Sequence, residues 1–158
     1  MTEFTINNLD DLNIFAGHLA KSIMKGDVIS LKGDLAAGKT SLVQAVGRHL
    51  GVEDYITSPT FALVNIYQSS KEDLNLYHLD LYRLERPEEI ENIDFETYFY
   101  PDDGISFIEW AEMAYDYLPE DLVELEISFE GEKRSIFFTR DNERSKEIER
   151  CINESFSG

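Results

Sequence analysis

The spacing of apolar residues in the first third of the chain predicts two helices with a strand between them. Apolar residues over 9–23 recur every three or four positions, which is typical of an amphipathic helix, and Asn8 is suited to cap its start. Residues 27–32 form a short apolar run that predicts a strand, and residues 39–50 return to helical spacing before Gly51, a typical helix stop. This region therefore predicts a strand, a glycine-containing loop and a helix in succession.

The remainder of the chain predicts mostly strands. Their predicted positions are residues 61–67, 74–81, 105–108, 122–129 and 134–139, with a short edge strand at residues 3–6. The first two and the last two of the later strands are separated by short polar segments, so each pair is expected to form a hairpin. Short helices are predicted from Pro87 through Ile90 and over residues 111–117, and an acidic linker is predicted between Ile90 and Gly104. From Asn142 onward the tail is predicted to be either a polar helix or a frayed end.

These elements predict an α/β fold in one domain. No internal repeat, low-complexity tract or long linker divides the chain, so residues 1–158 are expected to form a single domain. A chain of this length buries roughly 70% of its unfolded surface and needs no disulfide or metal to hold a core. The single cysteine, Cys151, agrees with a reducing compartment, and from the sequence we expect neither a membrane span nor a signal peptide. We therefore expect a cytoplasmic protein without a membrane partner.

Charge is distributed unevenly along the chain. The 14 Lys and Arg residues against 32 Asp and Glu residues give a net charge of −18. Residues 1–50 are neutral, with five bases and five acids, whereas residues 87–132 contain sixteen acids and no Lys or Arg. This balance argues against direct, tight binding to a nucleic-acid backbone, which needs clustered cations. The acidic run is either a docking face for a basic partner or a solvated surface.

Residues 33–40 carry the strongest chemical signal. They read Gly33-Asp34-Leu35-Ala36-Ala37-Gly38-Lys39-Thr40 and match the phosphate-loop pattern G-x-x-x-x-G-K-[ST], between a predicted strand and a predicted helix. In such a loop the backbone N–H groups surround phosphate oxygens, the lysine reaches the β and γ phosphates, and the threonine hydroxyl can ligate Mg²⁺. A purely structural glycine turn would leave Lys39 and Thr40 unexplained.

A phosphate loop also needs a carboxylate at the end of a neighbouring strand, to hold the Mg²⁺ shell and help to place water. Glu109 directly follows a buried run, where a merely solvating charge is unusual. Asp80 ends another predicted strand, but that strand alternates, so an ordinary surface carboxylate is an equally good interpretation. Glu109 is therefore the stronger candidate.

Thr60 and His78 are weaker candidates. Thr60 follows Pro59 at a turn, where its hydroxyl could sense the γ-phosphate or simply begin a strand, and the residues alone favour the second interpretation. His78 lies on a predicted strand, where a histidine is more often packed or hydrogen-bonded than a ligand. One cysteine and three histidines at no metal spacing predict no zinc site.

Four motifs follow one another between Leu31 and Pro119. They are the segment from Leu31 to Thr40, Ser58-Pro59-Thr60-Phe61, His78-Leu79-Asp80-Leu81-Tyr82-Arg83, and Ile108-Glu109-Trp110. Together they resemble the bacterial TsaE (YjeE) ATPases of tRNA threonylcarbamoyladenosine biosynthesis. The resemblance implies a P-loop NTPase-like fold whose mixed central β-sheet is flanked by helices and carries β-hairpins. It also implies slow, Mg²⁺-dependent ATP hydrolysis, accessory to the TsaD and TsaB proteins that transfer a threonylcarbamoyl group to tRNA adenosine.

The resemblance also implies roles for individual residues. Those expected to bind ATP or ADP are Gly33, Asp34, Leu35, Ala36, Ala37, Gly38, Lys39, Thr40, Ser41 and Trp110. Thr40 and Glu109 correspond to the Mg²⁺ ligands, and Thr60, Asp80 and Glu109 to the catalytic and switch positions. Arg83 belongs to a matching motif without an assigned role. The family usually has glycine at Ala36, and the added methyl group is expected to affect affinity rather than the class of activity.

Three functions are compatible with these residues. An ATP hydrolase is the leading hypothesis, and a nucleotide-dependent binding switch is the second, in which ATP orders the Thr60 segment for a partner and hydrolysis is incidental. A small-molecule kinase would normally bring basic residues over the transferred phosphate, and the base-free run over 87–132 argues against such a lid, although basic residues border it. A GTPase is disfavoured because no Asn-Lys-x-Asp signature occurs.

Overall fold

A mixed β-sheet forms the centre of the protein. A computed structural model describes residues 3–33, 38–57, 59, 63–71 and 73–157. Within them the strands are β1 (Glu3–Ile6), β2 (Val28–Lys32), β3 (Val64–Gln68), β4 (Asn75–Asp80), β5 (Gly104–Glu109), β6 (Val123–Glu130) and β7 (Lys133–Phe138). These form one sheet in the order β1-β7-β6-β2-β5-β4-β3. The central strands β6, β2, β5 and β4 are parallel, and the outer strands pair antiparallel.

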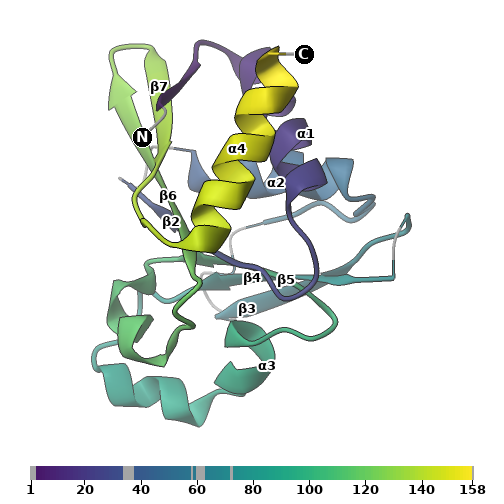
Figure 1. Ribbon diagram of the computed structural model, residues 1–158. Helices are drawn as coiled ribbons and strands as arrows, with labels where there is room; N and C mark the ends of the chain where they lie inside the picture. The colour runs from purple at the N-terminus through teal and green to yellow at the C-terminus, as the bar shows by residue number, and fades with distance from the viewer. Residues whose placement is uncertain (1–2, 34–37, 58, 60–62, 72, 158) are drawn as a thin grey trace.

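Helices cover both faces of this sheet (Figure 1). α1 (Leu9–Ser22), α2 (Lys39–His49) and α4 (Glu143–Ser157) lie on one face, and α3 (Phe95–Phe99) lies on the other with the 3₁₀ helices η2 (Pro87–Asn92) and η3 (Ala111–Tyr117). The buried apolar residues form two clusters accordingly, one containing Phe15 and Leu42 and the other containing Ile90 and Phe99. None of the described helices is long and apolar enough to cross a bilayer.

Most of the predicted elements are present at or near their expected positions. The Asn8 side chain accepts a hydrogen bond from the Asp11 N–H at 2.8 Å and caps α1. Both predicted hairpins form, as β3 with β4 and β6 with β7. The tail is helical, as α4. The prediction of an acidic linker was wrong in part, because this stretch contains α3. Phe99 of α3 is completely buried against the sheet.

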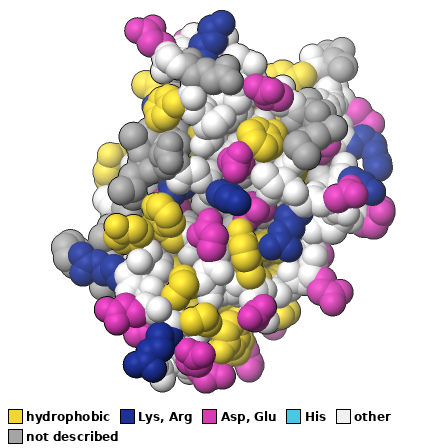
Figure 2. All heavy atoms as spheres, turned by 90° about the vertical axis from the view of Figure 1, so that its left-hand side faces the viewer, with side chains coloured by type: hydrophobic (Ala, Val, Ile, Leu, Met, Phe, Trp, Pro, Cys, Tyr) yellow, Lys and Arg dark blue, Asp and Glu magenta, His cyan; other side chains and the backbone are white. Residues whose placement is uncertain are grey.

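Charged side chains of both signs lie at the surface of the protein. On the face drawn in Figure 2, acidic side chains lie among hydrophobic and basic ones. This arrangement keeps like charges apart and limits their mutual repulsion.

An ion pair fastens α4 to the rest of the protein. Arg144 Nε and Nη2 donate to the two carboxylate oxygens of Asp27 at 2.8 and 2.6 Å, and Nη2 also donates to the Ser22 carbonyl at 3.0 Å. Asp27 in turn accepts a hydrogen bond from the Met24 N–H. The hydrogen bond to Asp27 raises the pKa of the Arg144 guanidinium. One side chain thus joins α4, the end of α1 and the start of β2.

We expect Arg144→Ala to lower the free energy of unfolding by about 3 kcal/mol, because it leaves the buried Asp27 carboxylate without its charged partner. Lys146→Ala is the matched control, since Lys146 pairs with the exposed Asp141 at 3.3 Å and should contribute less than about 1 kcal/mol. Urea unfolding of both variants measures the difference. Equal losses would show that the Asp27 pair has no special role.

Candidate phosphate site

The predicted phosphate loop connects the end of β2 to the start of α2. Gly33 follows β2 with φ 141°, and Gly38 precedes Lys39, the first residue of α2, with φ 93°. Both angles lie in the region that favours glycine. A Cβ atom on Gly38 would lie 2.7 Å from Nη1 of Arg134, so the end of this arginine side chain lies close to the loop. Residues 34–37, including Ala36, lie outside the described residues, and their roles stay predictions.

Lys39 is buried beside this loop and contacts Trp110. Its side chain is only 3% exposed, and Nζ donates to the Gly33 carbonyl at 3.0 Å. The same ammonium group lies 4.1 Å from the centre of the Trp110 ring, close enough for a cation–π interaction. The ring of Tyr82 packs against Trp110, with the ring centroids 5.1 Å apart. The structure therefore brings Lys39 and Trp110 together at the loop.

Thr40 and Glu109 also meet at this edge of the sheet. The Thr40 hydroxyl donates to Glu109 Oε2 at 3.1 Å. Glu109 is the last residue of β5 and is 5% exposed, opposite Leu31 of β2 and Asp80 of β4. A hydroxyl and a carboxylate are the hard oxygen ligands that Mg²⁺ prefers. The Thr40 hydroxyl and the Glu109 carboxylate therefore fit the predicted Mg²⁺, and they lie within hydrogen-bond distance of each other.

The structure describes most of the other predicted site residues, but not Thr60. Asp80 ends β4 beside Glu109, is 8% exposed, and accepts a hydrogen bond from the Tyr82 N–H at 3.0 Å, so it is not an ordinary surface carboxylate. Ser41 lies in the first turn of α2 and is partly buried. Thr60 lies outside the described residues, and Arg83 is exposed.

Two further residues contact the site, and the motifs did not assign them to it. His78 Nε2 lies 2.5 Å from Glu109 Oε2, and Arg134 of β7 lies against Gly38. The alternation of side chains along β4 places His78 on the same face as Asp80, so this position could have been found from the sequence. Arg134 is far from the loop in sequence, and only the pairing of β7 with β6 brings it close.

A buried carboxylate supports the site from the other face of the sheet. Glu124 accepts hydrogen bonds from Ser30 (2.9 Å), Tyr115 (2.5 Å) and Thr139 (2.7 Å). Burial raises the pKa of the Glu124 carboxyl, but these hydrogen bonds more than offset the effect, so its pKa lies below the ordinary value. Because Ser30 is in β2 and Tyr115 in η3, Glu124 ties the helix that follows Trp110 to the strand that precedes the loop.

Comparison with known proteins places this arrangement in a family. Residues 6–136 match the family model described as "Threonylcarbamoyl adenosine biosynthesis protein TsaE". The chain belongs to the TsaE family. The match includes β2, the loop, α2 and the ends of β4 and β5, so every described site residue lies within it. The family resemblance read from the four motifs is thereby confirmed, and the family is involved in tRNA threonylcarbamoyladenosine biosynthesis.

Similar proteins support the assignment along most of the chain. Three relatives are named tRNA threonylcarbamoyladenosine biosynthesis protein TsaE. The one from Synechocystis is 45% identical over 113 residues, which is 70% of each chain. Those from Bacillus subtilis and Rickettsia prowazekii are each 34% identical, covering 84% and 87% of this chain and 81% and 94% of theirs. The crystal structure of Bacillus subtilis YdiB has a TM-score of 0.77 at 26% identity, covering 98% of this chain and 95% of that one. The α/β fold of this TsaE-family protein, with its mixed sheet, is confirmed.

The contact between Lys39 and Trp110 yields a direct optical test. Trp110 is the only tryptophan, so its emission is expected to change when ADP and Mg²⁺ are added and the Lys39 ammonium turns from the ring towards the phosphates. A fluorescence titration measures this change, with binding checked independently by calorimetry. Binding of ADP without any change in emission would place the nucleotide away from Trp110.

Proposed function

We propose that this TsaE-family protein binds ATP with Mg²⁺ and hydrolyses it slowly, as an accessory to the TsaD–TsaB complex that forms threonylcarbamoyladenosine in tRNA. The observation that carries the proposal is the hydrogen bond between Thr40 and Glu109 beside the buried Lys39. A structural turn would need none of these three groups. A phosphoryl-transfer site needs all of them, because its catalysis consists mainly of positioning and charge stabilisation.

Each residue has a defined task in this proposal. Lys39 and the N–H groups at the start of α2 bind the phosphates, supported by the partial positive charge at the helix N-terminus. Thr40 and Glu109 hold Mg²⁺, which neutralises charge on the β and γ phosphates when bound. Asp80, at the neighbouring strand end, accepts a hydrogen bond from the attacking water. Thr60 is the switch position that senses the γ-phosphate.

The remaining parts of the proposal concern the surroundings of the protein. With 32 acids against 14 bases, the chain itself is poorly suited to bind tRNA, so the TsaD and TsaB partners hold the tRNA. The relatives named above share the pathway, and this supports both the partners and a cytoplasmic location.

Lys39→Ala should weaken ATP binding by at least about 100-fold, because it removes a buried cation that faces the loop. Lys32→Ala is the matched control, since Lys32 ends β2 next to the loop but is exposed. Calorimetric titration with ATP and Mg²⁺ compares the two affinities. Unchanged affinity in Lys39→Ala would refute the phosphate-site assignment.

Glu109→Gln separates an ATPase from a binding switch. The variant keeps the size of the side chain but loses its charge, so we expect ATP to bind while the hydrolysis rate falls by roughly 10²–10³-fold. Glu112→Gln, which changes an exposed acid three residues later, is the control. In tRNA modification reconstituted with TsaD and TsaB, Glu109→Gln should fail to support multiple rounds. Full activity of this variant would mean that hydrolysis is incidental.

A further inference from the structure

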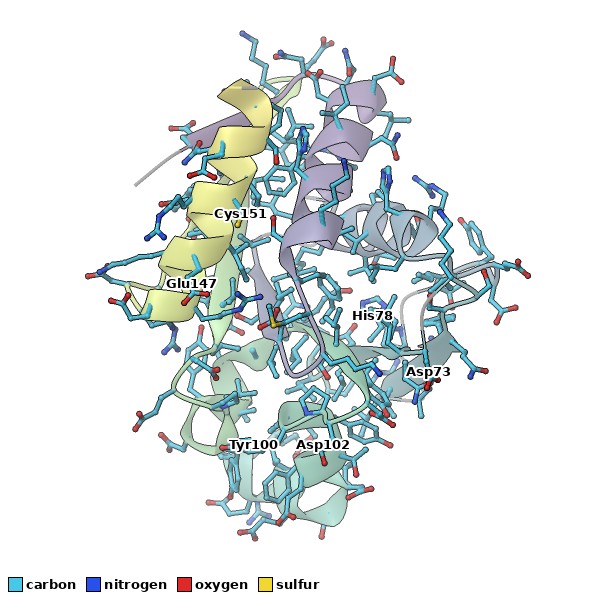
Figure 3. The ribbon with its side chains drawn as sticks, turned by 45° about the vertical axis from the view of Figure 1, so that its right-hand side comes forward. Asp73, His78, Tyr100, Asp102, Glu147 and Cys151 are labelled. Atoms are coloured by element: carbon cyan, nitrogen blue, oxygen red, sulfur yellow. The ribbon has the colours of Figure 1, made fainter. Side chains whose placement is uncertain are left out.

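His78 is a fully buried residue whose side chain contacts Glu109. Its exposed fraction is 0%, and its Nε2 lies 2.5 Å from Glu109 Oε2. Figure 3 shows His78 inside the molecule, on the side of the sheet that α2 covers. The other ring nitrogen, Nδ1, has no hydrogen-bond partner within the described part of the chain. Glu109 is therefore the one hydrogen-bond partner that the described residues offer this imidazole.

The register of the sheet produces this contact. In the parallel pairing of β4 with β5, His78 lies opposite Phe107 and Asp80 lies opposite Glu109. Side chains alternate along a strand, so all four of these residues point to the α2 face. His78 and Glu109 are thus diagonal neighbours on that face, within reach of long side chains. Any sequence that pairs these strands in this register holds the two positions together.

One oxygen of Glu109 accepts hydrogen bonds from two sides. Thr40 Oγ1 donates to Oε2 at 3.1 Å, and His78 Nε2 lies 2.5 Å from the same atom. An ionised carboxylate is an acceptor only, so His78 contributes its Nε2–H. The last torsion of a glutamate side chain is otherwise broad. Two donors, one from α2 and one from β4, restrict that torsion and present the second carboxylate oxygen in one direction.

We propose that His78 is a positioning residue for Mg²⁺: it holds the Glu109 carboxylate in the orientation that the metal and Thr40 require. The inference rests on the proposed function, because it assumes a Mg²⁺-nucleotide at this site. Outer hydrogen bonds of this kind orient metal ligands, and losing one typically weakens metal affinity or activity 10- to 100-fold. A histidine that only filled space between α2 and the sheet would affect stability alone.

Two amide substitutions distinguish these roles. In His78→Gln the side-chain nitrogen can occupy the place of Nε2, whereas in His78→Asn the shorter side chain places it near Nδ1, away from Glu109. Calorimetry gives the ADP affinity of each variant with Mg²⁺ and with EDTA, and steady-state assays give kcat for ATP. In His78→Asn, we expect the factor by which Mg²⁺ increases the ADP affinity to fall about tenfold or more, and kcat to fall by a similar factor. The ADP affinity measured in EDTA should stay within about threefold of the wild-type value. His78→Gln should stay close to the wild type.

Leu76→Ala controls for lost packing, because Leu76 is fully buried on the same face of β4, two residues before His78. It should lower the melting temperature without changing the Mg²⁺ dependence of ADP binding. If His78→Asn does not fold, His78→Met replaces it, since methionine fills a similar volume and has no donor.

The outcomes separate the two proposals. A wild-type protein whose ADP affinity is independent of Mg²⁺ would overturn the proposed function itself. A wild type that responds to Mg²⁺, together with a folded donor-free variant that responds equally, would overturn only the role of His78. The same conclusion follows if His78→Gln and His78→Asn lose the Mg²⁺ response to the same extent.

Discussion

The parallel pairing of β5 with β2 and β4 is the constraint on which the site depends. Carboxyl ends of parallel strands meet at one edge of a sheet, so Leu31, Asp80 and Glu109 come side by side although they are distant in sequence. The chain leaves β2 at this edge and returns as α2, which places Thr40 against Glu109. The loop, the helix start and both carboxylates are therefore assembled by strand order rather than by local sequence.

Assembling the site in this way requires the burial of charged groups, which is unfavourable unless each group is paired. The exposed fractions of Lys39, Glu109 and Asp80 are 3%, 5% and 8%. Each charge has a specific partner: the Gly33 carbonyl and the Trp110 ring for Lys39, two donors for Glu109, and the Tyr82 N–H for Asp80. These partners compensate the buried charges while no nucleotide is bound, and they hold the two carboxylates in place, which is the preorganisation that phosphoryl transfer needs.

Local patterns were sufficient to predict most of the elements, although not α3, because apolar spacing and capping are read from neighbouring residues. Asn8, the hairpins and the strand ends at Asp80 and Glu109 were predicted in this way. The position of Arg134 beside Gly38 could not be, because it follows from the pairing of β6 with both β2 and β7. The burial of Asp80 could not be predicted from the sequence for a similar reason. An alternating strand at the edge of a sheet exposes one face to solvent, but β4 lies between β3 and β5.

The net charge of −18 would by itself disfavour the approach of an anionic nucleotide. Distance and salt screening weaken this repulsion, because exposed charges separated by more than about 8 Å interact weakly at physiological ionic strength. Most of the acidic run from Pro87 to Glu132 belongs to α3, η2, η3 and their connections, on the face opposite α2. Lys39 is buried and screened much less, and the start of α2 adds its partial positive charge. The potential that a phosphate group meets at the loop is therefore set by a few neighbouring groups, and the acidic surplus of the chain can serve solubility or partner choice without opposing nucleotide binding.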